Sequence, residues 1–164
     1  MSLRTCCALL GIFVLVLFAT AEPVAPPSNF WGCWVITKML PTAGISGLSP
    51  EQVKAIVGTR LIFTPSCARS GRTAVPSPEY STTVLSDQDF FKLGYVRLGQ
   101  IGILEKKVTH VDLVKPELSD LDFPGNSVFL RKTDIVIEVE NDYFVAKRVK
   151  PDDATCMCEA KGAK

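Results

Sequence analysis

His110 and Asp112 carry the side chains best suited to acid–base chemistry, and His110 is the only histidine of the chain. Residues two apart on a strand share a face, so the imidazole would lie beside a carboxylate, as in general acid–base catalysis. In the expected strand at 107–114, however, the face with Val111 and Leu113 is the more apolar one. His110 is therefore expected to point outward to solvent. Because no serine or cysteine motif marks a nucleophile beside it, we predict no catalytic residue and no enzymatic activity.

Two further pairs of carboxylates have structural interpretations. Asp87 and Asp89 offer oxygen ligands for a cation, but they directly follow Ser86, a residue type that begins helices. Acidic residues in the first turn interact favourably with the helix dipole, so we interpret both as helix-capping residues. Glu138 and Glu140 alternate with apolar residues, which is typical of the solvent face of a strand. The sequence thus predicts no metal site and no cofactor.

Residues 1–21 have the pattern of a secretory signal peptide. One basic residue, Arg4, precedes an apolar run at 8–18 and small residues at 19–21. The run is short for a membrane span, so we predict cleavage before Glu22 and a secreted or periplasmic protein without a transmembrane segment. An uncleaved membrane anchor is the alternative.

The mature chain is expected to be electrically neutral. Of 18 basic and 17 acidic residues, removal of Arg4 with the signal leaves 17 of each. Without a basic run in the sequence, nucleic acid is not an expected partner. The remaining length suffices for one domain with a hydrophobic core.

Four cysteines lie beyond the signal: Cys33, Cys67, Cys156 and Cys158. An even number of cysteines in an exported chain favours disulfides. In an antiparallel sheet that closes on itself, the first strand begins beside the ends of the second and last strands. We therefore expect Cys33 to bridge one tail cysteine and Cys67 the other. A four-thiolate zinc site is one alternative, and a Cys33–Cys67 bridge with a local Cys156–Cys158 bridge is another.

The patterning predicts a Pro-rich leader at 22–28, a β domain at 29–150 and a Cys-containing polar tail at 151–164. Strands are expected at 32–38, 59–64, 80–85, 107–114, 127–131, 134–140 and 143–149, short helices after Ser49 and Ser86, and an exposed loop or weak edge strand at 65–78. Strands in this order favour a mainly β fold, an antiparallel meander closed or nearly closed into a small barrel with two short helices. An open α+β sheet with both helices on one face is the alternative.

The last two strands are expected to form a hairpin in which Glu140 pairs with Tyr143 across a two-residue turn. That register places Val139 opposite Phe144 and gathers the apolar residues of both strands on one face. It also brings Arg148 onto the same inner face.

Gly32-x-Trp34 in the first strand and Arg148 in the last resemble the pattern of the lipocalin and calycin family. In that family the Trp closes one end of the barrel and the Arg packs across it, so the resemblance implies a barrel-end plug made of Trp34 and Arg148. The helix expected between the first two strands departs from the family pattern.

Further motifs are similar to small exported bacterial proteins of uncharacterised function, a likeness that implies no activity. They are Trp34-Val35-Ile36-Thr37-Lys38, Val57-Gly58-Thr59-x-Leu61, Asp89-Phe90-Phe91, Val108-Thr109 and Phe123-Pro124-Gly125-Asn126.

The inward faces of the strands decide between two functions. They can line a cavity for a small apolar ligand, as the resemblance implies, or fill the barrel with side chains. The residues concerned are Ile36, Leu61, Phe63, Val128, Leu130, Ile135, Ile137, Val139, Phe144 and Ala146. We predict an exported, non-enzymatic, lipocalin-like binding protein for such a ligand. The alternative is a secreted or periplasmic domain with a filled core that binds or inhibits an envelope or extracellular protein.

Overall fold

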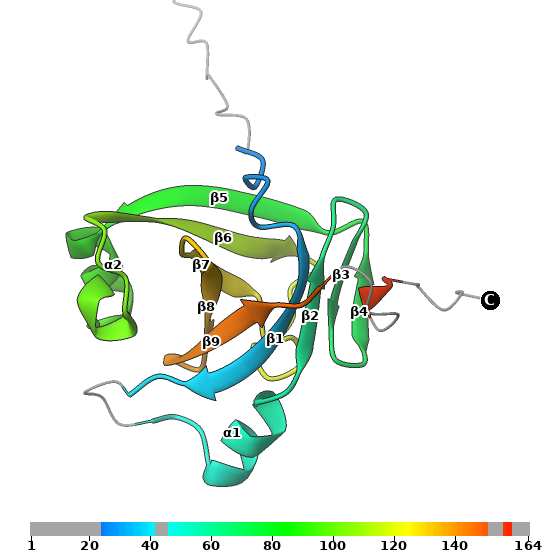
Figure 1. Cartoon of the computed structure of the whole chain (residues 1–164), viewed down its shortest axis with the longest axis horizontal. Coiled ribbons are helices and arrows are strands. Elements are labelled where there is room, and N and C mark those ends of the chain that lie inside the picture. The colour runs from blue at the N-terminus through cyan, green and yellow to red at the C-terminus, as the bar shows by residue number, and fades with distance from the viewer. Residues whose placement is uncertain (1–23, 42–45, 151–155, 159–164) are drawn as a thin grey trace, which may run out of the picture.

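The computed structural model describes residues 24–41, 46–150 and 156–158, so the signal peptide predicted at 1–21 lies outside the described residues. Nine antiparallel strands form one sheet with the order β4-β3-β2-β1-β9-β8-β7-β6-β5 (Figure 1). The strands are β1 (Gly32–Met39), β2 (Arg60–Phe63), β3 (Cys67–Ser70), β4 (Thr73–Pro76), β5 (Glu79–Ser86), β6 (Lys107–Lys115), β7 (Ser127–Leu130), β8 (Asp134–Val139) and β9 (Asp142–Arg148). The helices are α1 (Pro50–Ile56), α2 (Asp87–Gly94) and the 3-10 helix η1 (Leu98–Ile101).

The sheet curls into a half-barrel whose two edges are β4 and β5 (Figure 1). Consecutive strands pair with one another on each side, and β1 joins the two halves because it pairs with both β2 and β9. The predicted mainly β antiparallel meander with two short α-helices is confirmed. No described helix is long and apolar enough to cross a membrane.

The segment 65–78 forms the β3–β4 hairpin, which adds two strands to the seven expected. Gly71 occupies its turn with a φ of +55°, a conformation that glycine adopts without steric cost. Ala68 and Val75 are cross-strand partners, and both are buried in the inner core. The hairpin therefore packs one face on the core, with β4 as the edge strand.

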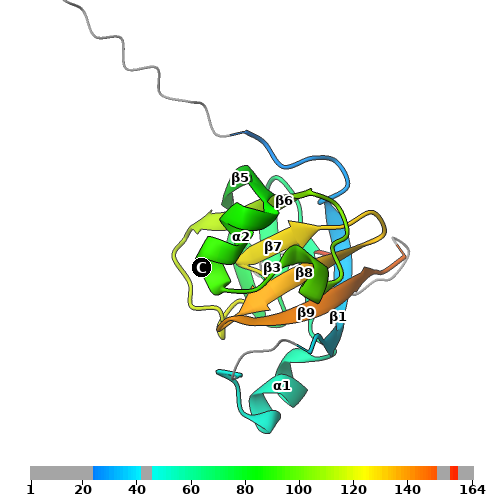
Figure 2. The same cartoon turned by 90° about the vertical axis from the view of Figure 1, so that its left-hand side faces the viewer.

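Both α-helices begin with the predicted caps. The Ser49 hydroxyl accepts a hydrogen bond from the Gln52 backbone N–H, and the Gln52 side chain accepts one from the Ser49 N–H at 2.7 Å, which completes a capping box. The Ser86 hydroxyl caps α2 in the same way through the N–H of Asp89. α1 lies at one end of the half-barrel, whereas α2 lies in front of β7 and β8 on the outer face (Figure 2).

The predicted pairing of Glu140 with Tyr143 is wrong by two residues. In the β8–β9 hairpin Glu138 pairs with Tyr143, and Val139 pairs with Asp142. The turn residues are Glu140 and Asn141, which both adopt positive φ angles of 51° and 66°, as a tight hairpin turn of matching twist requires. A shift of two residues leaves every side chain on its predicted face, because the side-chain period of a strand is two.

Two hydrophobic clusters lie on opposite faces of the sheet. The inner cluster occupies the inside of the curl, and the outer cluster lies between the sheet and the segment with α2 and η1. All ten residues predicted to face inward belong to the inner cluster or, for Leu130, pack against it. The outer cluster contains Phe90, Val96, Leu98, Ile101, Ile103, Val108, Phe129, Val136 and Tyr143.

Candidate functional site

Trp34 and Arg148 meet at one end of the half-barrel, where they are direct cross-strand partners on β1 and β9. The guanidinium carbon of Arg148 lies 4.1 Å from the centroid of the Trp34 ring, within the range of cation–π attraction. The same guanidinium donates hydrogen bonds to the backbone oxygens of Trp31, at 2.8 Å, and Asn29. The buried indole in turn donates from Nε1 to the oxygen of Phe30 at 3.1 Å. These contacts fasten the segment before β1 across the end of the half-barrel.

Gly32 makes this stack possible. A Cβ atom at position 32 would lie only 2.5 Å from Nη1 of Arg148, and the residue adopts a φ of +135°, which L side chains rarely adopt. The Gly-x-Trp spacing therefore has a local physical cause: the glycine leaves room for the guanidinium that covers the tryptophan two residues later.

Aromatic rings occupy the interior below this end. Phe30 stacks on Phe63 with ring centroids 4.6 Å apart, and Tyr80 contacts Phe30 edge-on at 5.4 Å. The Tyr80 hydroxyl donates to the backbone oxygen of Thr64 at 3.3 Å, which links edge strand β5 to the end of β2. Burial raises the pKa of Tyr80 well above its ordinary value, so this hydroxyl stays protonated and keeps its donor role.

The connection between β6 and β7, residues 116–126, closes the opposite end of the interior. Phe123 is fully buried, and a Cβ atom at Gly125 would lie 3.2 Å from Phe63 and 3.3 Å from Leu61. The Ser70 hydroxyl holds the connection by donating to the backbone oxygen of Pro124 at 2.9 Å. The ten residues predicted as cavity-lining candidates therefore contact one another and this connection as parts of one packed core.

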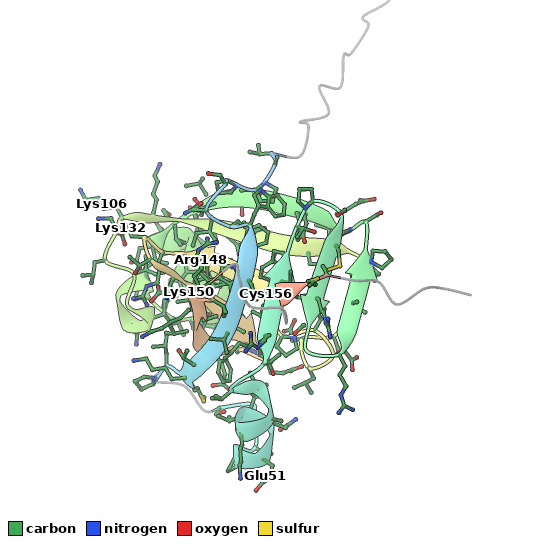
Figure 3. All side chains as sticks on the ribbon, turned by 45° about the vertical axis from the view of Figure 1, so that its right-hand side comes forward. Glu51, Lys106, Lys132, Arg148, Lys150 and Cys156 are labelled. Carbon is green, nitrogen blue, oxygen red and sulfur yellow. A yellow bond between two sulfur atoms is a disulfide. The ribbon has the colours of Figure 1, made fainter. Side chains whose placement is uncertain are left out.

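Two disulfides join the tail to the sheet, Cys33–Cys156 and Cys67–Cys158, with Cα–Cα distances of 5.7 Å and 6.1 Å (Figure 3). The expected pairing is confirmed, and both the zinc site and the local Cys156–Cys158 bridge are wrong. The pairing follows from topology, because β1 begins beside the end of β9, where Val149 donates to the oxygen of Cys33 at 2.9 Å. Two such bridges indicate an oxidising, extracytoplasmic location.

The prediction that His110 is a surface residue is wrong. Only 8 % of His110 is exposed, and its ring stacks on Phe129 with centroids 4.5 Å apart and an angle of 10° between the planes. Phe129 comes from the neighbouring strand β7 and belongs to the outer cluster under α2. The sequence-based prediction compared only how apolar the two faces of β6 are. It missed this burial because the groups that cover His110 come from other parts of the sequence.

Ser127 and Asp112 contact the same atom of His110, and this arrangement differs from a catalytic triad. Nε2 lies 2.8 Å from the Ser127 hydroxyl and 3.0 Å from Oδ1 of Asp112. In a serine–histidine–aspartate triad the two partners occupy opposite ring nitrogens, so that the carboxylate orients the ring while the other nitrogen accepts the serine proton. Convergence on one nitrogen therefore suits a structural polar cluster.

The pKa of Glu138 is raised in this cluster. Asp112, Ser127, Glu138 and Tyr143 form one row across β6 to β9. Burial is the main cause of the shift, and the charges of Asp120 and Asp112 add to it, whereas His110 opposes it. Glu138 thus lies on the predicted outer face but is partly covered rather than fully solvated.

Both carboxylates lie in the first turn of α2, where Asp89 acts locally, as predicted, whereas Asp87 contacts the start of η1. Asp89 accepts from the Ser86 hydroxyl and from Lys92, and these hydrogen bonds lower its pKa. Asp87 accepts from the backbone N–H of Leu98 at 2.9 Å. Within the described residues, histidine, cysteine and carboxylate side chains form no group of three or more that could hold a metal ion.

A surface hollow of about 370 Å³ lies beside the tip of the β3–β4 hairpin. Its lining comes from α1, from the hairpin tip and from the 116–126 connection, and it includes Gln52, Thr59, Arg72, Leu121 and Asp122. No pattern in the sequence marks this hollow, because its walls come from three segments that are far apart along the chain. Their meeting depends on the curl of the sheet.

Comparison with protein-family models, with curated proteins and with solved structures finds no match for this chain. Its function must therefore be inferred from the contacts, hollows and charges of the molecule itself.

Proposed function

We propose that the protein is an exported, non-enzymatic domain that binds another protein outside the cytoplasm through a rigid surface. The observation that carries this proposal is the occupied interior. The stacked rings of Phe30 and Phe63, together with the Gly125 backbone packed against them, take the space in which a barrel carrier holds its ligand. Packing of this kind among the described residues favours binding through the exterior.

The partner surface that we assign is the end with the hairpin tip, α1 and the 116–126 connection. Arg72 stands exposed at the tip and forms no ion pair with any described residue, and Leu121 is 44 % exposed across the hollow. The Cys67–Cys158 bridge fixes the base of the hairpin at β3. A fixed hairpin loses little conformational entropy on binding, which favours its use as a recognition loop.

Native mass spectrometry of protein purified from its own source tests the proposal directly. We expect either the bare mature chain with two disulfides or a defined complex with a protein. N-terminal sequencing of the same exported material should give Glu22 as the first residue, in line with the predicted signal cleavage. A stoichiometric small organic molecule retained by the folded chain would contradict the proposal and favour the lipocalin-like carrier instead.

An apolar fluorescent probe gives a second, source-independent test. Wild-type protein should not bind the probe at one site, because the interior is occupied. Phe63→Ala removes a fully buried ring and should create a cavity that takes up the probe. A different result would be saturable binding of one probe molecule by the wild type, with loss of that binding when larger side chains are placed on the inner face. This result would contradict the proposal and favour the lipocalin-like carrier.

The partner surface can be tested once a partner is isolated. Arg72→Ala and Leu121→Ser should each weaken the complex by more than about 1 kcal/mol if they are central contacts. Lys38→Ala, an exposed change on β1 outside the hollow, is the matched control and should leave affinity unchanged. Equal effects of all three variants would place the contact elsewhere.

A further inference from the structure

Lysines concentrate at one end of the sheet, although the molecule is nearly neutral as a whole. In an antiparallel sheet, the start of β6, the β7–β8 turn and the end of β9 lie at the same end. The lysines of these segments form what we call the basic end: Lys106, Lys107, Lys132, Lys147 and Lys150. Figure 3 shows Lys106, Lys132, Arg148 and Lys150 on one side of the molecule, far from Glu51 on α1.

Four of these lysines form no ion pair with a described residue, although Lys147 lies opposite Asp134 in the β8–β9 register. Lys132 has only a long pair with Glu105 at 3.9 Å, and its side chain is 87 % exposed. Arg131 lies among them, but it is already paired with Asp134 at 2.9 Å. Glu105 and Asp134 offset only part of the positive charge of this cluster, so the local potential remains positive.

Carboxylates gather at the opposite end. The 116–126 connection and the β8–β9 turn carry Glu117, Asp120, Asp122 and Glu140. Asp120 also accepts a hydrogen bond from the Glu140 backbone N–H at 3.4 Å, so these two segments are in contact. Lys54 on α1 and Arg72 at the hairpin tip lie at this same end and offset part of its negative charge. The excess of positive charge therefore lies at the basic end, and a negatively charged surface would orient the molecule with that end inward.

An exposed apolar side chain stands within the basic end. Leu104 is 89 % exposed, more than any other large hydrophobic residue in the described part of the chain. It lies two residues before Lys106, in the segment between η1 and β6. Val84, 63 % exposed on β5, is the cross-strand partner of Thr109 near the same end.

The basic end also surrounds a hollow of about 320 Å³, whose lining includes Lys107, Arg131 and Lys132, one carboxylate, Glu105, and the segment at Pro27 and Asn29. Three cationic side chains against one carboxylate leave the lining with an excess of positive charge, which suits an anionic headgroup.

We propose that the basic end docks on an anionic lipid bilayer, with its lysines against headgroup phosphates and Leu104 in the boundary between headgroups and acyl chains. Clustered lysines are attracted to anionic membranes, and an apolar side chain gains free energy by entering this boundary. A soluble polyanion would satisfy the lysines but would leave Leu104 in water. The exposed leucine therefore favours the bilayer. This site lies at the opposite end of the sheet from the hollow assigned to a protein partner, so either function can fail without the other.

Co-sedimentation with vesicles tests the proposal on the oxidised mature chain. The protein should bind vesicles that contain phosphatidylglycerol, should not bind pure phosphatidylcholine vesicles, and should be released by salt. Lys106→Gln, Lys132→Gln and Lys150→Gln should each lower partitioning about fivefold, and about 100-fold when combined, because each lysine near an anionic surface contributes about 1 kcal/mol. The matched triple variant Lys38→Gln, Lys54→Gln and Arg72→Gln removes three exposed charges away from the basic end and should change partitioning less than about twofold.

Leu104→Ser isolates the apolar contribution, with Leu121→Ser at the other end of the sheet as its control. We expect weaker partitioning for Leu104→Ser alone, with circular dichroism unchanged for both variants. Equal binding to both kinds of vesicle, or no binding to either, would overturn the proposal. So would binding to heparin or nucleic acid that is insensitive to Leu104→Ser and occurs without vesicle binding, because the basic end would then serve a soluble polyanion.

Discussion

Arg148 covers the indole of Trp34 at 4.1 Å while the same guanidinium holds the backbone that leads into β1. One side chain thus connects the last strand, the first strand and the segment before it. Removing either side chain exposes the other, so the contributions of Trp34 and Arg148 to the free energy of unfolding depend on each other.

Trp34→Ala should destabilise the protein by about 3–5 kcal/mol, because a buried indole is lost and the end of the half-barrel cannot collapse fully. Arg148→Ala should cost less, since its side chain is more exposed. The two losses should be non-additive in a double-mutant cycle measured by chemical denaturation with the disulfides intact. A loss below about 1 kcal/mol for Trp34→Ala would contradict the plug.

Glu138→Gln should stabilise the protein at neutral pH. The pKa of Glu138 is raised in the folded state above its ordinary value of 4.5, so the native state favours the protonated form. The free energy of folding that Glu138 contributes through its protonated form is therefore present in full below pH 4.5. It is lost as the pH rises through the raised pKa of the folded state. The stabilisation by glutamine should vanish in acid. The free energies of unfolding of wild type and Glu138→Gln, measured across this pH range, test the prediction.

His110→Ala should cost about 1–3 kcal/mol, because it removes a stacked and nearly buried ring from beside Phe129. His110→Phe keeps the stacking surface but loses the contacts of Nε2 with Ser127 and Asp112, so it separates packing from polar contacts. Thermal unfolding of both variants measures the difference. Stability unchanged in His110→Ala would mean that the ring is not packed on Phe129 as described.

Replacing Cys33 and Cys156 together by serine should cost about 4–5 kcal/mol in the chain-entropy model, because the bridge spans 123 residues. The Cys67–Cys158 bridge spans 91 residues and should contribute comparably. Denaturation of oxidised, reduced and double-serine forms provides the comparison. Equal stability of the oxidised and reduced forms would show that the tail constrains neither the folded nor the unfolded chain.

Features that depend on alternation and strand order could be predicted from the sequence. The inner face was assigned correctly even though the β8–β9 register was wrong by two residues, because an even shift preserves every face. The cysteine pairing followed from which strand ends must meet in an antiparallel meander. The caps at Ser49 and Ser86 could be recognised because each depends on residues within one helical turn.

Features created by distant segments could not be predicted in this way. The burial of His110 depends on Phe129 and on the cover over the outer face, neither of which is visible within β6. The basic end is likewise absent from the linear sequence, since its lysines come from three separate segments. Only the arrangement of strand ends brings them together.

The bridge between Cys33 and Cys156 also determines how the molecule carries mechanical load. A pull applied before Cys33 and after Cys158 passes through that covalent bond and then through Met157. The strands between the two cysteines stay outside the line of tension, so stretching cannot unravel the sheet while the bond is intact. A load applied through the two chain ends would therefore leave the sheet folded, and a reducing agent would remove that resistance.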